Sequence, residues 1–146
     1  MIIDLRELKR TGKEECDFFF EYCPEYELAD IPNVQTIHPV AVYGTVTLTG
    51  QHSAFVEGQA QFTLQGDCTR CLAQASNKYV AQFAESVEQG NNEGYPLVND
   101  KIDLTKIVDD AILVNMPVSF LCSQDCKGIC FNCGANLNVE QCKCNK

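Results

Sequence analysis

The spacing of the cysteines is the feature that most constrains what this 146-residue chain can become. Cys68 and Cys71 flank two residues, and six more cysteines fall within the last 25 residues, Cys122, Cys126, Cys130, Cys133, Cys142 and Cys144. Structural zinc is held by four tetrahedral ligands, commonly thiolates, and a gap of two residues lets a tight turn present two sulfurs to one ion. We therefore predict that these eight cysteines bind metal as two sets of four.

The spacing also indicates how the eight cysteines divide. A local, ribbon-like set in the tail would contain Cys130, Cys133, Cys142 and Cys144. The other set would tie the tail to the preceding strands through Cys68, Cys71, Cys122 and Cys126. Spacing alone does not fix this pairing, and it leaves open whether one zinc ion binds or two.

Two other uses of these thiols stay open at this point. Four thiolates also suit iron, so an iron–sulfur cluster is one alternative to zinc. A thiol-based redox sensor, in which oxidation of the cysteines ejects zinc, is another. Cys16 and Cys23 lie outside any such spacing. We expect these two to pack as small apolar side chains.

The cellular compartment follows from the apolar patterning. The first residues, MIIDLRELKRTGKEEC, carry charges from the fourth position and lack the apolar stretch of a secretory signal. No run of roughly 18 apolar residues occurs, so no spanning helix is expected. We expect a cytoplasmic protein that contacts no membrane, and thiols in the cytoplasm stay reduced. Metal binding therefore explains the cysteines better than disulfides do.

The charge balance limits the choice of partner. The chain has 11 basic and 20 acidic residues, a net charge of -9, and a pI near 4.6. Affinity for nucleic acid comes mainly from Lys and Arg that neutralise phosphates, so the chain is a poor autonomous binder of RNA or DNA. A basic protein suits it better. Residues 14–30 hold seven acids among aromatic residues, which fits either a surface for such a partner or an edge strand with solvated acids.

Apolar residues at every second position predict strands over residues 40–48 and 54–64, joined as an antiparallel hairpin by the turn TGQHS. A third strand is expected at about residues 78–87. Gly44 and Gly58 lie in the middle of the first two strands, where they suggest bulges or sharp curvature. The predicted fold is α+β and β-rich, with an antiparallel curled sheet or half-barrel.

The pattern changes after residue 99, which divides the chain into two predicted parts. Residues 1–99 form the β-rich domain that carries Cys68 and Cys71. Residues 100–146 form one amphipathic helix, with Asp103 as its N-cap and Pro117 after its end, followed by the cysteine-rich zinc-binding lobe. We expect the two parts to fold as one cooperative unit.

No catalytic motif accompanies the cysteines. The strings HExxH, GxSxG, GxxxxGK[ST] and GxGxxG are absent from the sequence. Zinc held by four thiolates has no open position for water or substrate. The sequence therefore predicts a protein that is not an enzyme and has no small-molecule substrate.

Three stretches of the sequence resemble the YceD family of large ribosomal RNA subunit accumulation proteins, which has bacterial and chloroplast members. They are QGDCTRCLAQ, KIDLTKIVDDAILVNMPVSFLC and CSQDCKGICFNCGANLNVEQCKC, and the opening IDLREL is also similar. Together they span nearly the whole chain. The CxRC string alone is a weak signal, whereas its combination with DCKGxCxxCGxxLN is specific.

The resemblance implies a non-enzymatic factor needed for accumulation or processing of the large-subunit ribosomal RNA. We expect its partners to be ribosomal or rRNA-processing proteins, with pre-ribosomal RNA as an indirect partner, and the sequence leaves open whether RNA is contacted directly. The eight spaced cysteines match the cysteines of the family, and Arg70 matches the arginine of the CxRC motif. We expect Arg70 to be a binding residue, whose guanidinium donates to a thiolate sulfur or reaches an RNA phosphate.

Overall fold

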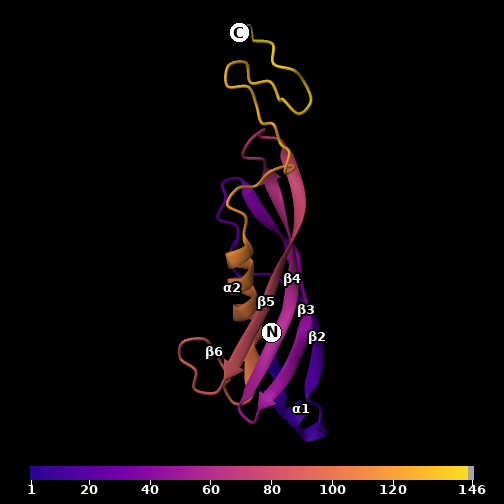
Figure 1. The fold of residues 1–146 in the computed structure, drawn as a ribbon, viewed down its shortest axis with the longest axis vertical. Coiled ribbons are helices and arrows are strands. Elements are labelled where there is room, and N and C mark those ends of the chain that lie inside the picture. Colours follow the sequence, from indigo (N-terminus) through magenta and orange to yellow (C-terminus); the bar gives the residue numbers. More distant parts are fainter. Residues whose placement is uncertain (145–146) are drawn as a thin grey trace.

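The structure, a computed structural model, describes residues 1–144 and shows an elongated molecule built on one long curled sheet (Figure 1). The sheet order is β2-β3-β4-β5-β6. Its strands are β2 (Glu15–Tyr22), β3 (Val34–Gly50), β4 (Ser53–Asp67), β5 (Gln74–Glu88) and β6 (Tyr95–Pro96). The first four pair antiparallel, and the short β6 runs parallel to β5. The predicted β-rich, curled antiparallel sheet is confirmed.

Within residues 1–144, two helices and a second, two-stranded sheet complete the fold. β1 (Ile2–Asp4) pairs antiparallel with β7 (Lys101–Asp103). This pairing joins the segment before the large sheet to the segment that follows it in the sequence. The predicted helix is α2 (Leu104–Asn115), and the Asp103 side chain caps it by accepting from the Thr105 N–H at 3.0 Å. A second helix, α1 (Leu5–Thr11), was not predicted. Neither helix has the length and apolar character that crossing a membrane would require.

A row of four residues crosses the middle of the sheet. Phe18, Gly44, Gly58 and Phe83 lie opposite one another on four successive strands. The two rings come from either side and lie over the glycine pair, with their centroids 6.5 Å apart and their planes 16° from parallel. The glycines mark no bulge. Register shifts occur instead between residues 37 and 41 and between residues 48 and 50 of β3.

The core lies between the inner face of the sheet and α2. From the helix it takes Leu104, Ile107, Val108 and Ile112, which are all at most 1% exposed. Two tyrosines fix the helix from opposite margins of the sheet. Tyr22 of β2 donates to Asp109 at 2.7 Å, and Tyr95 of β6 donates to Asp110 at 2.8 Å. Burial, reinforced by these carboxylates, raises the pKa of both tyrosines.

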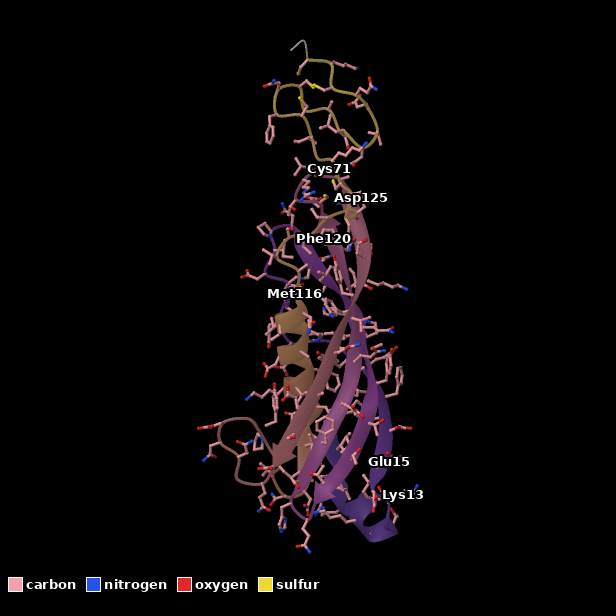
Figure 2. All side chains as sticks on the ribbon, viewed as in Figure 1. Lys13, Glu15, Cys71, Met116, Phe120 and Asp125 are labelled. Atoms are coloured by element: carbon pink, nitrogen blue, oxygen red, sulfur yellow. The ribbon has the colours of Figure 1, made fainter. Side chains whose placement is uncertain are left out.

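The chain after α2 runs along the sheet to the turn between β4 and β5. Figure 2 shows it passing Met116, Phe120 and Asp125 before the tail extends beyond the end of the sheet. Phe120 is fully buried, and its carbonyl accepts from the Thr69 N–H at 2.8 Å. Asn77 Nδ2 donates to the Leu121 carbonyl at 2.7 Å. These contacts place the tail cysteines beside those of the hairpin.

Candidate metal centres

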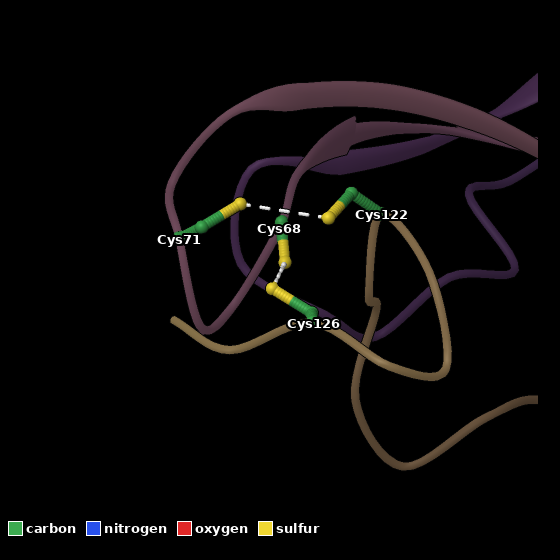
Figure 3. A group of neighbouring side chains, drawn as sticks. All are labelled: Cys68, Cys71, Cys122 and Cys126. Atoms are coloured by element: carbon green, nitrogen blue, oxygen red, sulfur yellow. Dashed lines mark hydrogen bonds between the residues drawn. The ribbon is translucent and has the colours of Figure 1, made fainter. Parts of the chain in front are cut away.

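The turn between β4 and β5 and the segment after α2 bring four cysteines together, Cys68, Cys71, Cys122 and Cys126. We call them the first quartet (Figure 3). Their sulfurs all lie within 4.8 Å of one another. The Cys68 and Cys126 sulfurs are 3.7 Å apart, and those of Cys71 and Cys122 are 3.5 Å apart. The hairpin turn and the segment after α2, which are distant in sequence, therefore place their cysteine sulfurs next to one another.

The hairpin turn is shaped to present its two sulfurs on one side. The Cys68 N–H bonds to the Ala73 carbonyl at 2.9 Å, and the Leu72 N–H bonds back to the Cys68 carbonyl at 2.9 Å. Leu72 takes a left-handed φ of 63°, an uncommon conformation for a residue other than glycine. The tight turn that results leaves the Leu72 side chain 63% exposed and buries both cysteines.

The tail carries the second quartet, Cys130, Cys133, Cys142 and Cys144. These sulfurs also lie within 4.8 Å of one another. Three pairs of them are separated by 3.2, 3.7 and 3.8 Å. The Gly134 N–H bonds to the Cys130 carbonyl at 2.9 Å, with Gly134 at a left-handed φ of 72°. Glycine takes this conformation at little cost, which permits the tight knuckle.

Both quartets fit a tetrahedral metal ion. Zinc–sulfur bonds of about 2.3 Å place the four sulfurs of a tetrahedral site about 3.8 Å from one another. The Cys71–Cys122 and Cys68–Cys126 sulfur separations, 3.5 and 3.7 Å, agree with that geometry. All eight cysteines are free thiols. The structure thus groups the cysteines as the spacing suggested, one quartet joining tail and hairpin and the other local to the tail.

Hydrogen bonds lower the pKa of two cysteines in each quartet, Cys68 and Cys126 in the first and Cys130 and Cys133 in the second. Burial acts to raise the pKa of Cys68, but N–H groups that include that of Cys71 outweigh it and lower the pKa to about 6. The N–H groups of Cys133 and Asn132 lower the pKa of Cys130 to about 6. Amide N–H groups stabilise a negative sulfur, so these thiols are predisposed to act as metal ligands.

Other cysteines of the quartets hold their protons more tightly. Hydrogen bonds with neighbouring sulfurs, above all that of Cys126, raise the pKa of Cys122 to about 12. Hydrogen bonds with neighbouring sulfurs, above all that of Cys142, raise the pKa of Cys144 to about 12 as well. Metal ligands must be deprotonated, so a bound cation would have to displace these protons. Acidic conditions are therefore expected to weaken metal binding at both quartets.

Asn138 connects the two quartets and was not predicted from the sequence. It lies in the loop of the second quartet, yet its Nδ2 donates to the Cys126 sulfur of the first at 3.3 Å. Its Oδ1 accepts from the Lys127 N–H at 2.9 Å. The ANLN string contains two asparagines, and nothing in the spacing distinguishes this one.

Arg70 and the two remaining cysteines take other positions. The Arg70 guanidinium donates from Nη1 to the Cys126 carbonyl at 3.1 Å, so it braces the backbone of the first quartet. Within residues 1–144 it makes no hydrogen bond to a sulfur. Cys16 is half-buried and Cys23 is exposed, and neither belongs to a quartet. The exposed position of Cys23 contradicts the expectation that it packs, because it lies just beyond the end of β2.

Comparison with known proteins places these quartets in a family. The model of the YceD family, described as the large ribosomal RNA subunit accumulation protein YceD, matches residues 56–146 and so includes all eight quartet cysteines. This chain belongs to the YceD family. The matched region begins inside β4, so the YceD match covers the hairpin turn, α2 and the tail.

Curated relatives support the YceD assignment. The chloroplastic large ribosomal RNA subunit accumulation protein YCED homolog 1 of Arabidopsis thaliana is 35% identical over 52 residues, 36% of this chain and 16% of the relative. The Zea mays homolog is 37% identical over 51 residues, 34% of this chain and 17% of the relative. An uncharacterized protein of Mycobacterium leprae is 39% identical over 95 residues, 58% of this chain and 43% of the relative. The chain thus spans less than half the length of these relatives. No solved structure matches it.

Proposed function

We propose that this chain is a non-enzymatic, zinc-binding factor of large ribosomal subunit assembly in the cytoplasm. It acts in the accumulation or processing of the large-subunit ribosomal RNA, through contacts with ribosomal or rRNA-processing proteins. The observation that carries the proposal is the family match over residues 56–146, which includes both quartets and takes its description from ribosomal RNA accumulation. The net charge of -9 supports protein contacts over direct contacts with RNA.

Single zinc ions suit the quartets better than iron–sulfur clusters. Four thiolates that surround a cluster of several irons must stand farther apart than four thiolates that surround one ion. The sulfurs of each quartet lie within 4.8 Å of one another, which fits one ion each. A zinc ion with four thiolate ligands is closed to water and substrate, so its contribution is structural.

The first quartet gives zinc its structural role in this chain. It joins the turn at Cys68 to the segment that ends at Cys126. Zinc bound there would support our proposal that residues 1–99 and residues 100–146 fold as one cooperative unit. Zinc binding contributes folding free energy directly, on the order of 10 to 16 kcal/mol in finger peptides. The ordered tail, with its few regular elements, would be the part that depends most on the metal.

Depletion of the protein from the cells that make it tests the proposed function. We expect the large-subunit ribosomal RNA to fall relative to the small-subunit ribosomal RNA, and wild-type protein to restore the ratio. Protein with Cys68→Ser and Cys71→Ser should restore it poorly, whereas Cys16→Ser with Cys23→Ser should restore it fully. An unchanged ratio after complete depletion would contradict the proposal.

Asn138 provides a test of the first quartet that leaves all its ligands in place. Groups that hydrogen-bond to metal ligands typically contribute about 10- to 100-fold in metal affinity. We therefore expect Asn138→Ala to weaken zinc binding at the first quartet by about tenfold, because the Cys126 sulfur loses its donor. Competition with a chromophoric chelator measures this affinity.

The matched control is Asn132→Ala, in the knuckle of the second quartet, where the side chain is exposed and only the backbone N–H faces a sulfur. Its first-quartet affinity should equal that of the wild type. Equal chelator resistance in Asn138→Ala and the wild type would show that Asn138 does not support the metal ligand.

A further inference from the structure

The edge strand β2 presents an unpaired backbone margin. It stands first in the sheet order and pairs on one side only, with β3. Within residues 1–144, no backbone group of Glu15–Tyr22 bonds to the backbone of any segment other than β3. Figure 1 shows β2 along the outer margin of the sheet, with no element beyond it. Its free N–H and C=O groups can therefore pair with an added strand.

The outward side chains of β2 are acidic and aromatic. Alternation along the strand leaves four side chains on the outer face, Glu15, Asp17, Phe19 and Glu21. Phe19 is 65% exposed and stands opposite Tyr43 of β3. Asp17 accepts from Thr45 Oγ1 at 2.7 Å. In the described chain, none of the three carboxylates forms a salt bridge.

The neighbouring strands do not neutralise this charge. Lys78 is the only Lys or Arg in β2 to β5. A hollow of about 500 Å³ on the outer face is lined by β3, β4 and β5, and it adds another carboxylate, that of Glu57. The edge therefore combines open hydrogen-bonding groups, exposed aromatic surface and unpaired negative charge.

We propose that β2 binds an extended basic segment of a partner protein, which joins the sheet as an additional strand. Strand addition uses the free backbone groups for affinity and alternate side chains for specificity. Lys or Arg at alternate positions would stand beside Asp17 and Glu21, as opposite charges across a strand pair, and an Arg could stack on Phe19. Acidic segments, including a second copy of β2, are rejected by like charge.

This inference deepens the proposed function, because it gives the surface and the chemistry of a partner. It rests on that function only for the source of the segment, a ribosomal or rRNA-processing protein. Such a surface would bind a basic segment through backbone hydrogen bonds and charge attraction. The same carboxylates would repel RNA phosphates.

The test uses a synthetic nine-residue peptide with Lys or Arg at alternate positions, titrated into the full zinc-loaded chain. Amide resonances of Glu15–Tyr22 should shift and their hydrogen exchange should slow, and calorimetry should give an affinity that falls with added salt. Asp17→Lys with Glu21→Lys should weaken binding by about tenfold or more, since two attractive pairs become repulsive. Glu88→Lys with Glu93→Lys makes the same change in net charge on exposed residues elsewhere and should leave the affinity unchanged.

A second peptide separates strand addition from simple charge attraction. Methylation of alternate backbone nitrogens keeps every charge and removes the strand hydrogen bonds, so this peptide should not bind. Equal binding of both peptides, shifts away from β2, or no binding at all would overturn the inference. Peptide binding with an unchanged ribosomal RNA ratio after depletion would instead overturn the proposed function alone.

Discussion

Replacing Cys68 and Cys71 by serine is expected to remove one zinc ion and release the tail after the buried Phe120. Beyond the buried Phe120, a metal held by the first quartet would be the main link between this segment and the hairpin, beside a few hydrogen bonds and the packing of Leu121 and Ile129. Replacing Cys130 and Cys133 should also remove one zinc, but it should release only residues 128–144, because the first quartet keeps its four ligands. The two variants thus differ in where the chain becomes accessible.

Elemental analysis and limited proteolysis with mass spectrometry measure both effects. The wild type should contain two zinc ions per chain, and each double variant should contain one. The matched control is Cys16→Ser with Cys23→Ser, which also removes two thiols and touches neither quartet. It should keep both zinc ions and a protected tail. Identical cleavage patterns in the two quartet variants would contradict separate sites, and a wild-type protein free of metal with an intact tail would contradict structural zinc.

Adding one methyl group at Gly58 is expected to destabilise the whole sheet by about 3 kcal/mol, at the upper end for overpacked cores. A Cβ at this position would overlap the Tyr43 carbonyl oxygen and lie 2.9 Å from Cζ of Phe83. It would also meet the Gly44 backbone at 2.8 Å. None of these groups can move without displacing a strand or the buried Phe83 ring. The Gly58→Ala substitution therefore strains the packing of the core.

Urea denaturation followed by far-ultraviolet circular dichroism measures this loss as a lower transition midpoint. The control is Ala84→Val, which adds bulk on the exposed face of the adjacent strand, opposite Glu57. Its midpoint should remain near that of the wild type, because Ala84 is exposed and lines the hollow on that face. A Gly58→Ala midpoint equal to the wild type would show that the two rings do not depend on the glycine pair.

The sequence predicted those parts of the fold whose signals are local. Alternation of apolar residues located β3, β4 and β5, because burial of one face of a strand repeats every second residue. Asp103 located the start of α2, because a capping residue stands at a fixed position before a helix. Helix α1 escaped prediction because its seven residues bury only Leu5 and Leu8, too few to establish a period. The strands also extend past their predicted ends, where polar residues continue the pairing toward the cysteine turn.

The candidate site shows the same division. Sequence spacing identified the eight thiols and suggested their division, but the meeting of the hairpin pair with a tail pair more than 50 residues away depends on the fold. The role of Asn138 depends on the fold, since its amide reaches a sulfur 12 residues away that belongs to the other quartet. An edge strand was one of the two interpretations of residues 14–30, and the sheet order confirms it. Which backbone groups of β2 stay unpaired depends on the sheet and could not be predicted from the residues.

The sulfurs of Cys68 and Cys126 bring together positions 58 apart in the chain. A zinc ion held there acts as a reversible cross-link, comparable to a disulfide in the loop that it closes but governed by metal concentration instead of redox potential. By mass action, each tenfold rise in free zinc above the dissociation constant adds about 1.4 kcal/mol to the folded state. The lifetime of this protein in a cell would therefore follow the metal supply, so that zinc starvation marks it for proteolysis.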